Sequence, residues 1–334
     1  MLFGRMRTAV TAAVALTVAG TCMGAAQADP ARLELKVTQS PAAMAAAAAA
    51  TCKVNTVIYN RSEACQTVQA TVRVTRNGKE IGRAAFTISH EMTLNKKSLK
   101  WSETTRVSKA TITGSAGGIS MGTSVSCGSP CKASSHVPRH TLGSVFSGKV
   151  DYNDGVKKNK IHSSAANYAF TFTKPGYTLG GFSYSSLGFR CDDSFWNAAN
   201  TRRILSPGCV FPKYIPTLTT MSTLPEIAKN IRKIQSKGGH YGKPGSGHPL
   251  HRLTDDAKAN ANRRAVCGKA KPVPGKSCDE YPFARTHEGG TALPAASRGI
   301  AMVPATEQDK QGGRIIGFYK QERMMDKDGF WVAV

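Results

Sequence analysis

Acidic residues are scarce in this sequence, and the shortage limits the partners that the protein can bind. The 334 residues include 45 Lys and Arg but only 21 Asp and Glu, a formal net charge of +24. A positive surplus of this size favours a polyanionic binding partner: a nucleic acid, an acidic cell-wall polymer or an anionic membrane. The basic residues are spread along the sequence and form no single cluster. This distribution favours binding over a broad surface, without preference for a particular sequence in the partner. A basic exported protein with no such partner is the alternative.

Long apolar runs are missing after the first residues, which excludes a predicted membrane-spanning helix there. At the N-terminus, Arg5 and Arg7 precede the apolar stretch Thr8–Val18, and a small-residue segment ends at Ala26-Gln27-Ala28. This order is typical of a signal peptide, residues 1–28, cleaved after Ala28. We therefore expect a secreted, extracellular protein. Its net charge would be +22, because Arg5 and Arg7 are removed and no acid is lost.

The sequence also lacks the paired C-x-x-C and H-x-H spacings of structural zinc sites. Eight cysteines follow the signal peptide, and an even number in an exported chain favours disulfides over zinc. Sequence alone leaves the connectivity open. The simplest pairing joins neighbours along the chain: Cys52 with Cys65, Cys127 with Cys131, Cys191 with Cys209, and Cys267 with Cys278.

Two kinds of secondary-structure pattern follow one another along the sequence, and together they predict an α+β protein. Short alternating segments such as Thr71–Arg76, followed by the hairpin turn Asn77-Gly78, predict a β-rich, sandwich-like accessory domain. Mixed helix and strand signals near the C-terminus predict a compact α/β domain. The expected divisions are an Ala- and Pro-rich tether at 29–50, the β-rich domain at 51–180, a connecting region at 181–214, and the α/β domain at 215–334.

Capping residues locate the helices of the second domain. Thr223-Leu224-Pro225-Glu226 is a capping box with proline in the first turn, and Gly238-Gly239 would end that helix. A second helix is expected from Thr254 to Cys267. A third, around 314–319, would be entered through Gly312-Gly313. The remaining predictions are strands at 300–303 and 330–334, and a loop with His240, His248 and His251 between the first two helices.

The most informative motifs lie in the last 60 or so residues of the chain. They are, in order, Asp279-Glu280-Tyr281-Pro282, Glu288-Gly289-Gly290, Val303-Pro304, Glu307-Gln308 and Gln311-Gly312-Gly313. Together they resemble the NucA/NucB family of bacterial extracellular deoxyribonucleases. Upstream, Leu224-Pro225-Glu226, Gly239-His240 and Arg263-Arg264 also match features of that family. The resemblance covers roughly 215–334 and leaves the β-rich region unmatched.

The resemblance implies a nuclease that hydrolyses DNA with a divalent cation, Mg²⁺ or Mn²⁺, and little sequence preference. Asp279 would be the general base, and Glu307, with Gln308 beside it, would hold the metal. Glu280 would be a partner of Asp279 or another ligand. Phosphodiester hydrolysis needs a base for the water and a cation for the phosphate, and hard cations prefer oxygen ligands. Because side chains alternate along a strand, Asp279 and Glu280 should face opposite ways.

Other interpretations stay open at this stage. The adjacent acids could be surface residues that pair with lysines, and His251 is a second candidate for the base. Five cations could bind the DNA backbone or simply be solvated: Arg263, Arg264, Arg285, Lys310 and Arg314. The alternative functions are a non-catalytic binder of DNA or of an anionic cell-wall polymer, and a phosphodiesterase that acts on RNA. No obligate protein partner is evident.

Overall fold

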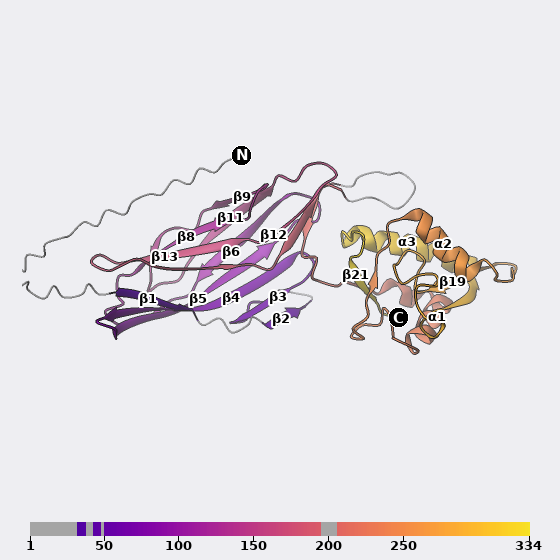
Figure 1. Cartoon of the computed structure of the whole chain (residues 1–334), viewed down its shortest axis with the longest axis horizontal. Coiled ribbons are helices and arrows are strands. Elements are labelled where there is room, and N and C mark those ends of the chain that lie inside the picture. The colour runs from indigo at the N-terminus through magenta and orange to yellow at the C-terminus, as the bar shows by residue number, and fades with distance from the viewer. Residues whose placement is uncertain (1–31, 38–42, 48–49, 195–205) are drawn as a thin grey trace, which may run out of the picture.

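The computed structural model describes residues 32–37, 43–47, 50–194 and 206–334, which form two domains side by side (Figure 1). We call residues 32–214 the β domain and residues 215–334 the C-terminal domain. The predicted signal peptide, residues 1–28, lies outside the described residues. Within the described part, no helix has both the length and the apolar character needed to cross a bilayer.

The β domain is built from two facing sheets and a smaller third one, all antiparallel except that β2 runs parallel to β3. The order of the large sheet is β2-β3-β4-β5-β6-β11-β9, with β1 beside β4 and β7 beside β5, and the second sheet is β10-β8-β13-β14. The third sheet is β12-β15-β16. The strands are β1 Arg32–Val37, β2 Ala43–Ala46, β3 Thr56–Tyr59, β4 Glu63–Arg76, β5 Lys79–Thr93, β6 Lys100–Val107, β7 Thr111–Gly114, β8 Ser120–Ser126, β9 Cys131–Ser135, β10 His140–Thr141, β11 Phe146–Asp154, β12 Ile161–Ser164, β13 Asn167–Thr173, β14 Gly180–Ser185, β15 Phe189–Asp192 and β16 Gly208–Val210.

Alternating burial explains why these segments form a sandwich. In β5 every second residue from Gly82 to Met92 is buried, so one face of the strand enters the core and the other meets solvent. Phe86 of β5 meets Phe172 of β13 across the two sheets, with ring centroids 6.0 Å apart. The predicted hairpin turn is present, with positive φ at Asn77 (50°) and Gly78 (73°), as such two-residue turns require.

The structure differs from the expected tether and connecting region on either side of this domain. Within 29–50, β1 pairs with β4 and β2 pairs with β3. Within 181–214, β15 pairs with β16, and Phe211 is fully buried in the β-domain core. Local composition gave no signal for these strands, because their hydrogen-bonding partners lie far away in the sequence.

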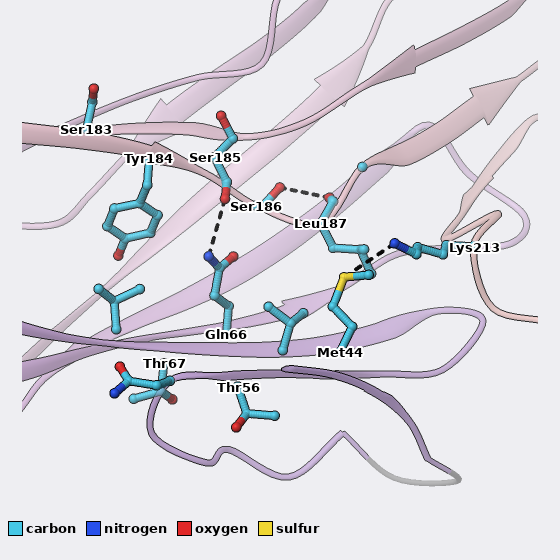
Figure 2. A pocket seen from close by; sticks show the side chains of 14 residues that line it. Met44, Thr56, Gln66, Thr67, Ser183, Tyr184, Ser185, Ser186, Leu187 and Lys213 are labelled. Carbon is cyan, nitrogen blue, oxygen red and sulfur yellow. Dashed lines mark hydrogen bonds between the residues drawn. The ribbon is translucent and has the colours of Figure 1, made fainter. Parts of the chain in front are cut away.

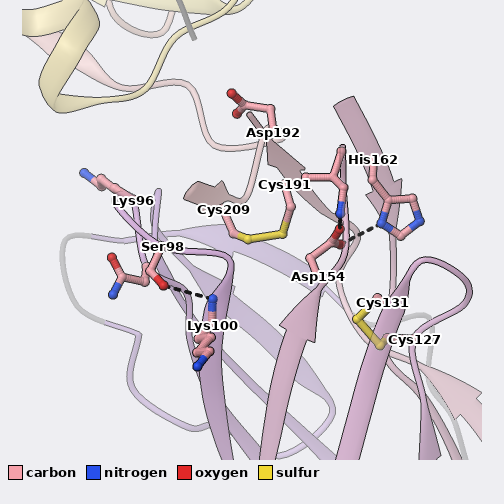
Figure 3. Close-up of a disulfide and its surroundings, with 12 residues drawn as sticks. Lys96, Ser98, Lys100, Cys127, Cys131, Asp154, His162, Cys191, Asp192 and Cys209 are labelled. Carbon is pink, nitrogen blue, oxygen red and sulfur yellow. Dashed lines mark hydrogen bonds and ion pairs between the residues drawn. A yellow bond between two sulfur atoms is a disulfide. The ribbon is translucent and has the colours of Figure 1, made fainter. Parts of the chain in front are cut away.

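All four predicted disulfides are present and join Cys52 to Cys65, Cys127 to Cys131, Cys191 to Cys209, and Cys267 to Cys278. The third of them links β15 to β16 beside Asp192 (Figure 3). The fourth ties helix α2 (Asp256–Cys267) to strand β19 (Lys276–Tyr281) of the C-terminal domain.

The C-terminal domain packs three helices around short sheets, so the described chain is α+β, as predicted. One sheet has the order β17-β21-β18, and β19 and β20 form a separate antiparallel pair. The elements are β17 Thr217–Leu218, the 3₁₀ turn Thr220–Thr223, α1 Pro225–Gln235, β18 Leu250–His251, α2 Asp256–Cys267, β19 Lys276–Tyr281, the 3₁₀ turn Ala295–Ser297, β20 Gly299–Pro304, α3 Ala305–Gln321 and β21 Gly329–Val332.

Two helix predictions are wrong in detail. The Thr223 hydroxyl bonds to the carbonyl of Thr220, so it does not cap α1, whose N-cap position is Leu224. Helix α3 begins at Ala305 and runs straight through Gly312 and Gly313, which are exposed helical residues and not its entrance. The glycines cost about 1 kcal/mol each in a helix. Burial of Gln311, Ile315 and Tyr319 along one face offsets that cost.

Ion pairs join the two domains. Asp328 of the C-terminal domain accepts hydrogen bonds from Arg61 (2.6 Å) and from both terminal nitrogens of Arg190 (2.7 and 2.9 Å). In a second ion pair the C-terminal domain supplies the cation: its Arg323 donates to both carboxylate oxygens of Asp192 in the β domain, at 2.9 and 2.7 Å. The three arginines and Asp192 are almost completely buried. We call these five residues the interdomain ion cluster.

Candidate active site

The predicted catalytic strand is β19, and helices cover both of its faces. Asp279 faces α1 and α3, where it contacts Asn230 and Gln311. Glu280 faces α2, where it contacts Arg263. The predicted opposite orientation of the two acids is therefore observed, and it follows from the alternation of side chains along an extended strand.

Asp279 is completely enclosed, with an exposed fraction of 0%. The amide of Asn230 donates to Oδ2 at 2.8 Å, and the amide of Gln311 donates to Oδ1 at 2.7 Å. Burial raises the pKa of Asp279 to about 6, although both amides and the charge of Arg263 lower it in part. A carboxyl group with such a pKa can take up and release a proton near neutral pH.

Glu280 lines a cavity of about 170 Å³ between α2 and α3. Its Oε2 accepts a hydrogen bond of 2.8 Å from Arg263, which also donates to the carbonyl of Cys278. Burial raises the pKa of Glu280 to about 7, with Arg263 opposing the shift. Gln311 lines the same cavity, so its side chain touches both the cavity and Asp279.

The two residues predicted to hold a metal begin α3. Oε2 of Glu307 accepts from the backbone N–H groups of Glu226 and Ile227, at 3.1 and 3.2 Å. Glu307 thus supplies, from another helix, the cap that α1 lacks. Gln308 lines the cavity and donates to Oε1 of Gln311 at 3.0 Å.

The histidines of the loop differ in role. Nδ1 of His240 bonds to the carbonyl of Gln235 and Nδ1 of His248 to that of Gly239, so both brace the loop backbone. Nδ1 of His251 lies 2.7 Å from Oε1 of Glu288, and the hydrogen bond that the imidazole donates to that carboxylate raises the pKa of His251. Among the described residues, no hydrogen bond or ion pair joins His251 to Asp279 or Glu280.

The predicted DNA-binding cations fall into two groups. Arg263 and Arg285 are engaged in ion pairs, with Glu280 and Asp256, and Arg314 bonds to the 3₁₀ turn before α1. Arg264 and Lys310 are exposed, and in the described part of the chain they make no ion pair. Of the five predicted cations, these are the two that extend into solvent with no partner among the residues that the structure describes.

Three polar residues of this region were missed by sequence reasoning: Asn230, Gln311 and Glu288. Asn230 lies on the buried face of α1 among isoleucines, and a polar side chain at a core position was a signal that could have been used. Gln311 was quoted only as part of a glycine-rich motif. Glu288 was considered only as part of the motif Glu288-Gly289-Gly290, although a carboxylate is a natural partner of an imidazole, here that of His251.

A small cavity with adjacent buried acids, in a strongly basic chain, is the arrangement expected of an enzyme that moves protons on a polyanionic substrate. The family model for deoxyribonuclease NucA/NucB matches residues 241–333 of this chain. The matched range contains α2, β19, β20 and α3, but it begins after α1. No curated protein matches the chain. The predicted NucA/NucB-type C-terminal domain is thereby confirmed over the matched range, and the match implies a nuclease.

Proposed function

We propose that the protein is a secreted deoxyribonuclease that hydrolyses DNA at the cavity between α2 and α3 with the help of a divalent cation. The observation that carries the proposal is the pair of adjacent acids on β19, Asp279 and Glu280, both buried and both with raised pKa. They lie in the segment that matches the NucA/NucB family.

The proton steps are assigned to the acids of β19. Water attacks phosphorus and its proton passes to the carboxylate of Asp279. One P–O ester bond breaks, and the departing oxygen takes a proton from solvent, which leaves a phosphomonoester and a hydroxyl. Because Gln311 separates Asp279 from the cavity, its side chain must turn away before Asp279 meets a water there. Glu280 already lines the cavity, so it is the competing candidate for the base.

Glu307 and Gln308 fit the requirements of a hard cation such as Mg²⁺ or Mn²⁺. Oε1 of Gln308 is a buried oxygen that has no hydrogen-bond partner in the described structure, and oxygen ligands are what such cations prefer. The described residues contain no group of three or more His, Cys, Asp or Glu side chains able to hold a metal. Mg²⁺ commonly uses one or two carboxylates and completes its shell with water and phosphate oxygens. A bound cation would neutralise charge on the phosphate.

Export and DNA binding complete the proposal. The signal-peptide pattern at the N-terminus and four disulfides support an extracellular location. The exposed Arg264 and Lys310 are the best placed cations for phosphate contacts, which bind DNA without reading its sequence.

Cleavage of plasmid and linear DNA by the oxidised mature protein tests this function. The reaction is run with Mg²⁺, with Mn²⁺ and with EDTA, for the wild type and for Asp279→Asn, Glu280→Gln and Glu307→Gln. Asp309→Asn is the matched control, because Asp309 is an exposed acid two residues from Glu307 on the same helix. Thermal unfolding of each variant separates loss of activity from loss of fold.

We expect metal-dependent cleavage that Asp279→Asn and Glu307→Gln reduce by about 100-fold or more, as removal of a general base or ligand does. The control should cleave normally. Full activity in Asp279→Asn with loss in Glu280→Gln would move the base to Glu280, and loss in His251→Ala alone would move it to His251. A folded wild type that binds DNA but cuts neither DNA nor RNA under any metal would refute the nuclease and favour a binding protein.

A further inference from the structure

The β domain contains a cavity of about 870 Å³ that no part of the proposed nuclease mechanism uses. It lies where β3 and β4 of the large sheet face the end of β14 and the residues that follow it (Figure 2). Its volume is within the range of sites that bind small molecules or polymer segments. Every lining residue belongs to the β domain, so the cavity is a separate site.

One buried polar atom in the cavity wall has no partner. Gln66 of β4 is 8% exposed, and its amide nitrogen donates to the carbonyl of Ser185 at 3.3 Å. Its Oε1 is buried and accepts no hydrogen bond within the described residues. Figure 2 shows this side chain standing between the two walls of the cavity. An unsatisfied buried acceptor is costly. Because this oxygen is not exposed, the amide of Gln66 must turn for it to face the cavity, and a ligand that donates an O–H or N–H group would favour that turn.

The rest of the lining combines an apolar floor with a hydroxyl-rich rim. Val57, Val68 and Leu187 are buried apolar residues, whereas Thr56 and Ser183 contribute hydroxyl groups. A sugar ring has the same division, with C–H groups on its faces and O–H groups around its edge. This match of surfaces favours a carbohydrate over a wholly apolar ligand.

The charge of the residues that line the cavity narrows the class of ligand further. No Asp or Glu is among the lining residues, and Lys213 is the one cation there. Its ammonium group contacts the sulfur of Met44 at 3.6 Å, and it has no ion pair with any described carboxylate. Lys213 is exposed to solvent at the cavity, so its ammonium group is available to pair with a carboxylate group on the ligand.

We infer that this cavity binds a segment of an acidic glycan, a sugar chain that carries carboxylate groups. A ligand hydroxyl donates to Oε1 of Gln66, and a ligand carboxylate pairs with Lys213. A peptide fits less well, because Gln66 already occupies the carbonyl of Ser185, which an added strand would need. Single-stranded DNA also fits less well, because Tyr184 is buried and bonded to His90, and offers no face for base stacking.

Calorimetric titration of the oxidised mature protein with tetragalacturonate, in EDTA, tests the inference. Cellotetraose, a single-stranded oligothymidine and a serine-rich peptide are the comparison ligands. The variants are Gln66→Leu and Lys213→Gln. The matched controls are Gln69→Leu, an exposed glutamine on the same strand, and Lys79→Gln, an exposed lysine at the start of β5 outside the cavity lining.

The expected result is binding of tetragalacturonate that weakens about tenfold or more in Gln66→Leu and in Lys213→Gln, and in neither control. DNA cleavage in dilute solution should not change in these variants, which separates this site from the proposed nuclease site. No binding of tetragalacturonate, or equal binding of all variants, overturns the inference. If cellotetraose, which is neutral, binds as strongly as tetragalacturonate, the inference that the glycan is acidic is overturned. If the protein prefers the DNA or the peptide, the inference that the ligand is a glycan is overturned.

Discussion

The interdomain ion cluster leads to a quantitative prediction for Asp328→Asn. Asparagine keeps the size of the side chain but removes its charge, so Arg61 and Arg190 lose their shared carboxylate. Both arginines are buried, with exposed fractions of 2% and 7%. Removing one partner of a buried ion pair typically costs about 3–5 kcal/mol, because the other charge is left buried and uncompensated.

The matched control is Asp151→Asn. Asp151 pairs with Lys149 at 2.7 Å, but their side chains are 46% and 60% exposed. An exposed pair of this kind contributes at most about 1 kcal/mol. Urea unfolding followed by circular dichroism and by tryptophan fluorescence gives the free energy of unfolding of each variant. Limited proteolysis reports whether the two domains separate.

We expect Asp328→Asn to lose about 3–5 kcal/mol and to show earlier cleavage between the domains, whereas the control should follow the wild type. If Asp328→Asn loses no more than the control does, the cluster does not stabilise the contact between the domains, and the reasoning from burial is refuted.

Acid should weaken the same contact. Burial, the largest influence, raises the pKa of Asp328, but the hydrogen bond from Arg190 and the charges of both arginines outweigh it and leave the pKa below its ordinary value of 3.8. The stabilisation is therefore complete above that value and disappears as the pH falls through the lower folded-state pKa. The difference between wild type and Asp328→Asn should shrink below about pH 4.

Three further predictions concern the C-terminal domain. The rate of DNA cleavage should fall about tenfold per pH unit below the pKa of Asp279, which is about 6. Because Asn230 lowers that pKa, Asn230→Ala should move this acid limb of the pH–rate profile to higher pH. An acid limb that does not move would remove Asp279 from the proton step. Replacing Cys267 and Cys278 by alanine should cost about 2–3 kcal/mol of stability in thermal unfolding, and an unchanged transition would contradict that. Arg264→Gln should weaken DNA binding, and in titrations at several salt concentrations it should lower the salt dependence of the binding constant by about one phosphate contact. An unchanged salt dependence would exclude a contact between Arg264 and a phosphate.

Sequence patterns predicted what depends on neighbours along the chain. The hairpin turn at Asn77-Gly78, the nearest-neighbour disulfides and the opposite faces of Asp279 and Glu280 all follow from local geometry. The family motifs also led to the segment that the NucA/NucB model matches. The catalytic and metal-binding roles stay predictions.

Features that depend on distant residues were not predictable in the same way. Thr223 looked like a helix cap, but the cap comes from Glu307, 80 or so residues further along the chain. Gly312-Gly313 looked like the start of a helix, but packing of Ile315 overrides the local preference. The interdomain ion cluster joins residues from three separate segments of the chain, around Arg61, β15 and the residues after α3, and no local pattern marks it.

The position of Glu307 has a consequence for the strength of the proposed cation site. One oxygen of this carboxylate is shared by two backbone N–H groups at the positive end of α1, which already draw on its negative charge. A carboxylate so occupied is a poorer donor than a free one. An ion held there would exchange readily with solvent and would be retained mainly when DNA phosphate adds its own oxygens. In that arrangement the substrate completes the site, and the empty protein has little tendency to store metal.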